Sequence, residues 1–255
     1  MIRISRPEKK PKSLKTKGIQ INIENCKSFE KDAEVFLSKF KAVSSVYGSK
    51  SVKKALKKAQ HNKCCFCEKN QVDEYGAVEH FRPKAGYKIK KGDKKLIKPG
   101  YYWLAYDWTN LLFVCGVCNT TYKQNFFPLV KERNRATSHL TNVSREEPLL
   151  IDPCGTKDPT DHIKFKNNLP FSEDNFGKRT IEICGLDRDA LNSLRAKLIS
   201  DIDARIVILS AKDSHSASEI QDAWNYLVES QNPSSEFSST ARNYLQQFEI
   251  DLTQN

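Results

Sequence analysis

Two short stretches decide the fold of this chain: Lys63-Cys64-Cys65-Phe66-Cys67 and Cys115-Gly116-Val117-Cys118. Each contains two cysteines separated by two residues, a spacing that lets one tight turn point both sulfur atoms at a single ion. Four thiolates of this kind close a tetrahedral zinc site, with Zn–S bonds of about 2.3 Å. The sequence therefore predicts a structural zinc ion held by Cys64, Cys67, Cys115 and Cys118.

The other cysteines bear on the choice between zinc and disulfide bonds. Cys65 leaves an alternative open, because a Cys65-x-Cys67 pair competes with Cys64 for the same ion. Cys26, Cys154 and Cys184 are isolated, and we expect them to be small buried hydrophobic residues. The first residues of the chain lack an apolar leader, so the paired cysteines favour metal in a reducing compartment, with disulfides as the alternative.

Between the cysteine pairs the pattern indicates two short strands. Val78-Glu79-His80-Phe81 has strand character and ends before Pro83. Asn110 opens a second strand that runs into Cys115. The aromatic run from Gly100 to Trp108 leads into this strand, and we expect it to pack in the core and not to stack on bases.

A helix beginning near Cys118 places Asn119 and Lys123 four residues apart on one face. His80 is the candidate general base of the chain, because an imidazole with a pKa near about 6.5 accepts a proton at neutral pH. The other histidines have no comparable sequence context. We therefore expect the chemistry of this protein to centre on His80.

The most basic window runs from Arg82 to Lys98, and Gly92-Asp93 in its middle is typical of a hairpin tip. A positively charged hairpin next to His80 is well placed to hold a phosphate backbone. The alternative is a solvated loop whose lysines keep the protein soluble. The basic residues that we expect to bind nucleic acid are Arg82, Lys84, Lys88, Lys90, Lys91, Lys94, Lys95 and Lys98.

Charge is unevenly distributed along the 255 residues, whose net charge is +11. Residues 1–125 carry 27 Lys or Arg against 11 Asp or Glu, whereas residues 126–255 carry 15 against 20. The half that holds the cysteines thus attracts polyanions such as nucleic acid. There is no run of eighteen apolar residues, so we expect a cytoplasmic protein with no membrane segment.

The sequence predicts mainly helices in the regions that flank the cysteine motifs. Residues 1–25 are basic and weakly periodic, which predicts an extended arm that drapes over the domain or a ligand, with disorder as the alternative. Apolar residues spaced by three and four predict a helix over residues 28–42, and another from Ser49 or Ser51 to Ala59. A strand is expected over residues 149–151, paired with residues 163–165. The same periodicity predicts helices through most of the last third of the chain.

These motifs together resemble the HNH endonuclease family with its ββα-metal finger, and within it the PtuB-type HNH subunits of Septu antiphage systems and the HNH proteins that accompany retrons. The resemblance covers roughly residues 50–155. Its carriers are Cys64-Cys65-Phe66-Cys67-Glu68, Val78-Glu79-His80-Phe81-Arg82-Pro83-Lys84, Trp103-Leu104-Ala105-Tyr106-Asp107-Trp108-Thr109-Asn110-Leu111, Cys115-Gly116-Val117-Cys118-Asn119 and Glu147-Pro148-Leu149-Leu150-Ile151-Asp152-Pro153.

The resemblance implies a role for each matched polar residue. Glu79 and Asn119 would hold one Mg²⁺ or Mn²⁺ through their side-chain oxygens. Asn110 would pin the loop behind His80 and so orient the imidazole. Lys123 stands where some HNH enzymes have a final His, and we expect it to contact phosphate. Two departures are the Glu in place of a frequent Asp and the missing final His, which leaves only two protein ligands for the cation.

The sequence thus predicts an α+β protein with a zinc-stapled nuclease core over residues 62–130. A basic arm and helices precede it (1–61), and a mostly helical region follows (131–255). The resemblance implies metal-dependent hydrolysis of phosphodiester bonds, with DNA as the expected substrate, under the control of a PtuA-like ABC-type ATPase. Two alternatives remain open: a zinc-knuckle module that binds nucleic acid without cleaving it, and a nuclease that acts on structured RNA such as tRNA.

Overall fold

The computed structural model describes residues 1–73 and 76–248 and contains two small antiparallel sheets. In the first, β1 (Ala77–His80) pairs with β2 (Leu111–Val114), so that His80 lies opposite Leu111. Every residue of β2 is buried. Both strands predicted between the cysteine pairs are therefore confirmed. In the second sheet, β3 (Lys164–Lys166) pairs with β4 (Leu169–Phe171) as a hairpin.

The arm expected over residues 1–25 is found only in its first part: residues 1–11 form no helix or strand and lie against the folded chain, whereas the residues that follow are helical. Met1, Ile2 and Ile4 are buried, and the Ile4 amide donates a hydrogen bond of 2.8 Å to the carbonyl of Pro153. A π-helix, η1 (Leu14–Gly18), then runs directly into α1 (Ile19–Lys31). Met1, Ile2 and Ile4 pack against distant parts of the chain, so local periodicity does not predict their burial.

The helix predicted over residues 28–42 is in fact the end of α1 and a separate helix, α2 (Ala33–Lys39). Asp32 separates them, because its backbone is extended and its side chain caps α2 by accepting a hydrogen bond from the Val35 amide. A short α3 (Ser44–Tyr47) and α4 (Lys50–Ala59) follow. Of the two predicted starts, Ser49 and Ser51, Ser49 is the residue that caps α4.

The aromatic run before β2 lies in the core, which confirms the packing role expected for it. It forms two 3₁₀ helices, η2 (Tyr102–Leu104) and η3 (Trp108–Asn110). Phe29 of α1 stacks on Tyr102 with ring centroids 4.9 Å apart. The buried aromatic side chains of the run are Tyr101, Tyr102, Trp103, Tyr106 and Trp108.

After β2 the chain forms mainly short elements. Residues 149–151 are not a strand: the Leu149 amide bonds to the Pro128 carbonyl, and the Ile151 amide bonds to the Thr180 hydroxyl oxygen. The partner expected for this segment pairs instead within β3–β4. The short elements and the helix that follows them are η4 (Val117–Lys123), η5 (Glu132–Asn134), η6 (Val143–Arg145), α5 (Pro159–His162) and α6 (Asn175–Cys184).

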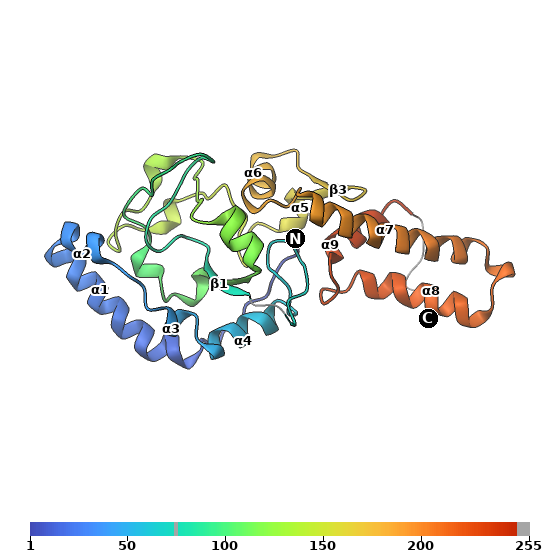
Figure 1. Cartoon of the computed structure of the whole chain (residues 1–255), viewed down its shortest axis with the longest axis horizontal. Coiled ribbons are helices and arrows are strands. Elements are labelled where there is room, and N and C mark those ends of the chain that lie inside the picture. The colour runs from blue at the N-terminus through green and yellow to red at the C-terminus, as the bar shows by residue number, and fades with distance from the viewer. Residues whose placement is uncertain (74–75, 249–255) are drawn as a thin grey trace.

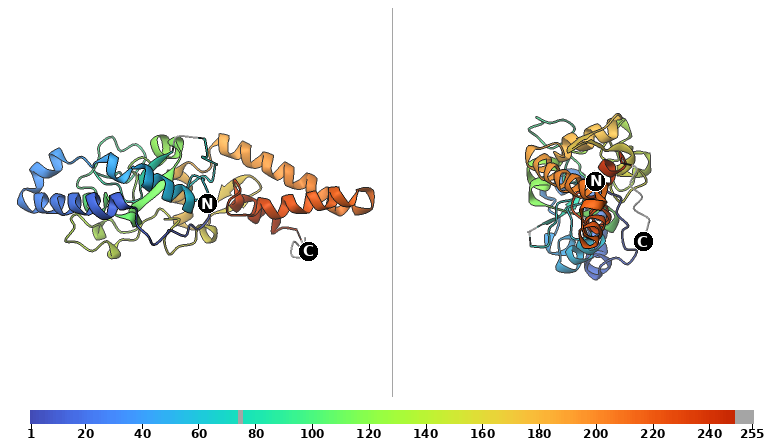
Figure 2. Two further views of the ribbon diagram at one scale, coloured as in Figure 1. Left: turned by 90° about the horizontal axis from the view of Figure 1, so that it is seen from below. Right: turned by 90° about the vertical axis from the view of Figure 1, so that its right-hand side faces the viewer.

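The last third is helical, as predicted. Helices α7 (Asp189–Ser210) and α8 (Ala217–Ser230) form an antiparallel pair that extends away from the rest of the protein, at the opposite end from α1 and α2 (Figures 1 and 2). The 3₁₀ turn η7 (Lys212–Ser214) joins them, and α9 (Ser238–Leu245) packs against their base. Within the described residues, no helix is both long and apolar enough to cross a membrane.

A buried ionic cluster ties the first cysteine pair to the C-terminal helices. Glu68, next to Cys67, accepts a hydrogen bond of 3.2 Å from the Lys63 ammonium and one of 3.0 Å from the Ser238 hydroxyl at the start of α9. The amino group of Met1 forms an ion pair of 2.6 Å with the same carboxylate. Glu68 thus joins three distant parts of the chain through one buried charge.

Replacing this carboxylate should destabilise the fold strongly. In Glu68→Gln the buried ammonium of Lys63 loses its counter-ion, and we expect the free energy of unfolding to fall by about 3–5 kcal/mol. Urea denaturation of the zinc-loaded protein measures this change. Glu229→Gln, an exposed site on α8, is the matched control and should change stability by less than about 0.5 kcal/mol. Equal effects of the two substitutions would contradict a structural role for the Glu68 cluster.

Candidate active site

The four cysteines of the two Cys-x-x-Cys pairs come together in the fold. The sulfur atoms of Cys64, Cys67, Cys115 and Cys118 all lie within 4.8 Å of one another, and all four residues are buried. Sulfur atoms bound to one tetrahedral zinc ion are about 3.8 Å apart, given bonds of about 2.3 Å. The observed 3.9 Å between the sulfurs of Cys67 and Cys115 fits this value. The four residues can therefore hold a structural metal ion such as zinc.

Local hydrogen bonds present these sulfurs at the edge of the first sheet. The Cys65 amide donates to the Phe113 carbonyl of β2, which anchors the first pair beside the strand that leads to Cys115. Gln60, at the end of α4, also binds the Phe113 backbone, donating to its carbonyl at 2.7 Å and accepting from its amide at 2.9 Å. Cys118 lies in the first turn of η4. A metal ion at the cysteines would therefore fix α4, β2 and η4 relative to one another.

Cys65 does not belong to this cluster, which settles the alternative that its spacing left open. Its side chain lies in the hydrophobic core, where burial raises the pKa of the thiol well above its usual value. Cys184 is also buried, as expected, whereas Cys26 and Cys154 are only partly buried. All eight thiols are free, so none of them forms a disulfide.

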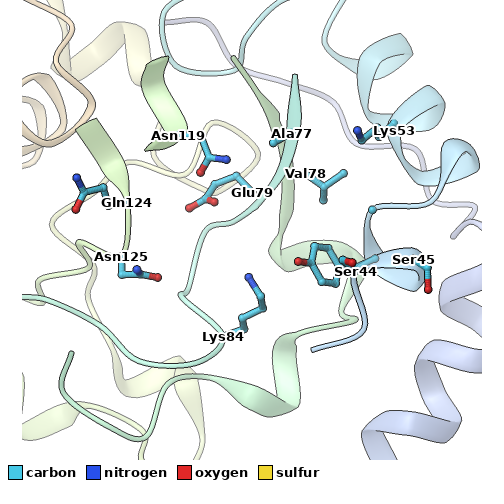
Figure 3. Close-up of a pocket in the computed structure, with 12 residues that line it drawn as sticks. Ser44, Ser45, Lys53, Ala77, Val78, Glu79, Lys84, Asn119, Gln124 and Asn125 are labelled. Carbon is cyan, nitrogen blue, oxygen red and sulfur yellow. The ribbon is translucent and has the colours of Figure 1, made fainter. Parts of the chain in front are cut away.

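An open pocket of about 580 Å³ lies beside β1, and it brings together the two residues that the family resemblance implies as cation ligands. The carboxylate of Glu79 and the amide of Asn119 lie side by side at its edge, and Lys84 points towards them from the opposite wall (Figure 3). Glu79 comes from β1 and Asn119 from the first turn of η4. The cysteine cluster at the start of η4 thus helps to set the position of Asn119.

His80 is buried just behind this pocket, and its ring is held on both sides. The carbonyl oxygen of Ala105 lies 2.9 Å from Nε2. Because a carbonyl only accepts, Nε2 carries the proton, and the lone pair is on Nδ1. Nδ1 faces the Lys84 ammonium at 3.4 Å, and the ring of Tyr47 packs edge-on against the imidazole. Burial, followed by the nearby charge of Lys84, lowers the pKa of His80 well below its ordinary value.

Asn110 clamps the segment that follows His80. Its side-chain oxygen accepts from the Arg82 amide at 2.7 Å, and its side-chain nitrogen donates to the Arg82 carbonyl at 3.0 Å and to the Leu104 carbonyl at 3.2 Å. Leu104 precedes Ala105, whose carbonyl binds the His80 ring. The single buried amide of Asn110 therefore joins both segments that determine how the imidazole is oriented.

Lys123 does not lie on the surface, where a direct phosphate contact would require it. Its side chain is fully buried at the end of η4 and donates to the Glu79 carboxylate at 2.6 Å and to the His80 carbonyl at 2.9 Å. The arrangement favours a role as counter-ion of Glu79 over the phosphate contact that we had expected. The sequence spacing of four residues between Asn119 and Lys123 does not indicate that the Lys123 side chain points into the protein.

The pocket also contains residues that the sequence analysis missed. Tyr47 and Ser44 come from α3, and Gln124 and Asn125 follow η4. Burial raises the pKa of Tyr47, so its hydroxyl stays protonated at neutral pH. Lys84, which we had grouped with the basic hairpin, is part of the pocket wall, and burial lowers its pKa. No spacing rule links α3 to the cysteine motif, so its contribution appears only in the folded chain.

The basic window forms the predicted hairpin only in part. Tyr87 and Ile97 exchange two backbone hydrogen bonds, and Gly92 at the tip has a positive φ, but no regular strand forms there. Arg82 forms an ion pair of 2.9 Å with Glu146, so its side chain is already engaged in the fold. Lys84 and Lys88 are partly buried. The members exposed to solvent are Lys90, Lys91, Lys94, Lys95 and Lys98.

The chain is similar to two Septu proteins of Bacillus mycoides (strain KBAB4). It is 42% identical to the Septu protein PtuB over 165 residues, which are 63% of this chain and 55% of that protein. It is 24% identical to the Septu protein PtuA over 164 residues, which are 64% of this chain and 23% of that protein. The aligned part is therefore about half of PtuB and less than a quarter of PtuA. No protein-family model matches the chain.

The cysteine cluster makes a direct prediction about metal content. Cys118→Ser removes one of the four sulfurs, so we expect the purified protein to lose its zinc and to unfold at lower temperature. Cys65→Ser changes a neighbouring buried thiol outside the cluster and should leave the zinc content unchanged. Elemental analysis of both variants measures the metal directly. Full zinc content in Cys118→Ser, or loss of zinc from Cys65→Ser, would contradict the assignment.

Proposed function

We propose that this protein is a metal-dependent endonuclease of the HNH type that hydrolyses phosphodiester bonds in nucleic acid. The observation that carries the proposal is the position of His80, whose Nδ1 lone pair faces the pocket side chain of Lys84 while Nε2 is held by the Ala105 carbonyl. Glu79 and Asn119 line the same pocket. A general base buried directly behind an open pocket, with two oxygen ligands in the pocket wall, supplies the groups that hydrolysis of a phosphodiester requires.

In this proposal His80 takes a proton from the attacking water through Nδ1. The Ala105 carbonyl accepts a hydrogen bond from Nε2–H throughout and stabilises the imidazolium that forms, because this hydrogen bond becomes charge-assisted. The low pKa of His80 keeps the ring neutral before the reaction. Asn110 acts as a positioning residue, since its amide holds the backbone on either side of this arrangement.

The residues of the pocket fit a small divalent cation. Glu79 has a second carboxylate oxygen besides the one bound by Lys123, and Asn119 offers an amide oxygen beside it. Mg²⁺ commonly binds to one or two protein oxygens and completes its shell with water and substrate phosphate. When bound, Mg²⁺ or Mn²⁺ would neutralise charge on the departing oxygen.

Lys84 and the exposed lysines of the hairpin are the proposed contacts to the nucleic acid backbone. Lys84 binds Nδ1 of His80 in the free protein. A phosphate oxygen in the pocket would attract the ammonium and leave Nδ1 free to accept a proton from water. DNA is the proposed substrate. Similarity to two Septu proteins supports a role in antiphage defence, with a PtuA-like ATPase as the proposed partner.

A second candidate function is a module that binds nucleic acid without cleaving it. The ion pair between Lys123 and Glu79 favours this alternative, because an ammonium already neutralises the carboxylate that would hold the cation. The two functions make different predictions for the loss of His80, since a binding module has no use for a general base.

Substitution of the base separates the two functions. We expect the protein, with its ATPase partner where that is needed, to nick supercoiled plasmid in Mg²⁺ or Mn²⁺. His80→Ala should lower the rate by about 10²–10⁴-fold, the usual contribution of a general base, and retain DNA binding in a gel-shift assay. His215→Ala, in the turn between η7 and α8, is the matched control. An unchanged rate in His80→Ala, or no metal-dependent nicking by the complex, would contradict the proposal.

The hairpin lysines should set the salt dependence of binding. Replacing Lys90, Lys91, Lys94 and Lys95 by Gln should make the slope of log affinity against log salt shallower, by up to about 0.9 for each phosphate that the protein no longer neutralises. Four exposed lysines of the C-terminal half serve as the control: Lys164, Lys166, Lys197 and Lys212. Fluorescence anisotropy with labelled duplex measures both slopes. Equal slopes in the two quadruple variants would exclude the hairpin as the main phosphate-binding surface.

A further inference from the structure

The ion pair between Glu79, at the edge of the pocket, and the buried Lys123 behind it bears on how a cation can bind there. Lys123 places its ammonium 2.6 Å from one carboxylate oxygen of Glu79, and a second hydrogen bond to the His80 carbonyl fixes it there. The Lys123 side chain is fully buried, so solvent screens this charge only weakly. A cation that binds Glu79 therefore has to do so beside a fixed positive charge.

The balance of charge around the pocket is positive in the free protein. Glu79 is the only carboxylate among the described residues that line it, whereas Lys53 and Lys84 are both in the wall. Counting Lys123, which lies behind Glu79, the pocket region contains three ammonium groups and one carboxylate. The balance stays positive even without the contribution of Lys84. A dication that enters alone is repelled, because the Coulomb energy grows as the local dielectric falls.

A phosphodiester reverses this situation. It brings one negative charge and two unesterified oxygens, which attract the lysines and supply ligands that the protein lacks. Glu79 and Asn119 offer only two ligand groups, and Mg²⁺ sites of this kind commonly use substrate phosphate to complete the shell. A bound phosphate offsets the repulsion that opposes the cation, and a bound cation adds a further attraction for the phosphate.

We propose that the divalent cation and the nucleic acid bind to this pocket cooperatively, and that Lys123 is the residue that suppresses cation binding in their absence. This inference rests on the proposed function, because it uses the same pocket and a phosphate ligand. Linkage makes the effect reciprocal: the factor by which nucleic acid tightens cation binding equals the factor by which the cation tightens nucleic acid binding. Free protein would then carry little Mg²⁺ in the pocket.

The test uses the full chain with His80→Ala, so that the nucleic acid stays intact. Mn²⁺ binding is followed by electron paramagnetic resonance with and without a DNA duplex, and duplex binding is followed by anisotropy with and without Mn²⁺. We expect each ligand to tighten the other by about tenfold or more, with the two factors equal. The double variant Glu79→Gln/His80→Ala lacks the pocket carboxylate and therefore measures how much Mn²⁺ the duplex binds outside the pocket. Equal Mn²⁺ affinity with and without duplex would overturn the inference.

Lys123→Met tests the residue itself in the same background. Removing the ammonium should raise the Mn²⁺ affinity of the free chain by about tenfold or more and shrink the effect of the duplex. Lys53→Met removes a charge from the same wall but from a residue that makes no ion pair with Glu79 in the described chain, so its effect should be much smaller. A Lys123→Met protein with unchanged Mn²⁺ affinity would show that Lys123 does not set the coupling.

The cooperativity can be measured even if Lys123→Met does not fold, and its failure can be told apart from failure of the proposed function. Loss of the buried partner of Glu79 destabilises Lys123→Met, but the measurement on His80→Ala with and without duplex needs no substitution at Lys123. Failure of the proposed function is separate, because it would appear as absent nicking by the complex even where Mn²⁺ and duplex bind cooperatively. Nicking together with independent binding of the two ligands would overturn only the inference.

Discussion

Convergence of four buried sulfur atoms is the constraint on which the rest of this structure depends. Cys64 and Cys67 follow α4, Cys115 comes directly after β2, and Cys118 lies in the first turn of η4. Without a common ion, these sulfurs gain little from lying within 4.8 Å of one another. The cluster fits zinc, and a zinc ion there would fix the end of the sheet against the start of η4. Two residues of the pocket wall, Glu79 of β1 and Asn119 of η4, are positioned by this junction.

Two buried side chains, Glu68 and Asn110, connect this junction to other parts of the protein. Glu68 connects the first cysteine pair to Lys63 and to the start of α9, so the C-terminal helices are anchored next to the cluster. Asn110 joins Arg82, two residues after β1, to the turn that carries Ala105, and thereby holds the His80 ring in one orientation. The residues that hold the core together thus lie in the same part of the fold as the candidate site, while the α7–α8 pair extends away from it.

Spacing rules predicted the parts of the site that are local or metal-directed. The Cys-x-x-Cys pairs and both strands were predicted from the sequence because each leaves a pattern within a few residues. The burial of Met1 and Ile4 was not, because it depends on contacts with residues far along the chain. The break at Asp32 was missed because an apolar period that continues through a capping residue resembles one helix.

The charged residues show the limit of sequence analysis most clearly. Nothing in the spacing of Lys123 distinguishes a surface phosphate contact from a buried partner of Glu79, since both need a basic residue one turn after Asn119. Only the folded structure, in which Lys123 donates to Glu79 and to the His80 carbonyl, separates these roles. Tyr47 and Ser44 were missed for a related reason: they come from α3, which no motif connects to the site.

Anomalous diffraction from crystals of the His80→Ala chain, grown with Mn²⁺ and a DNA duplex, tests the central claim most directly. The account predicts a zinc signal at the four cysteine sulfurs and a separate manganese signal between Glu79, Asn119 and a backbone phosphate, on the side of the pocket that residue 80 faces. Manganese elsewhere, or a duplex bound away from this pocket, would contradict it.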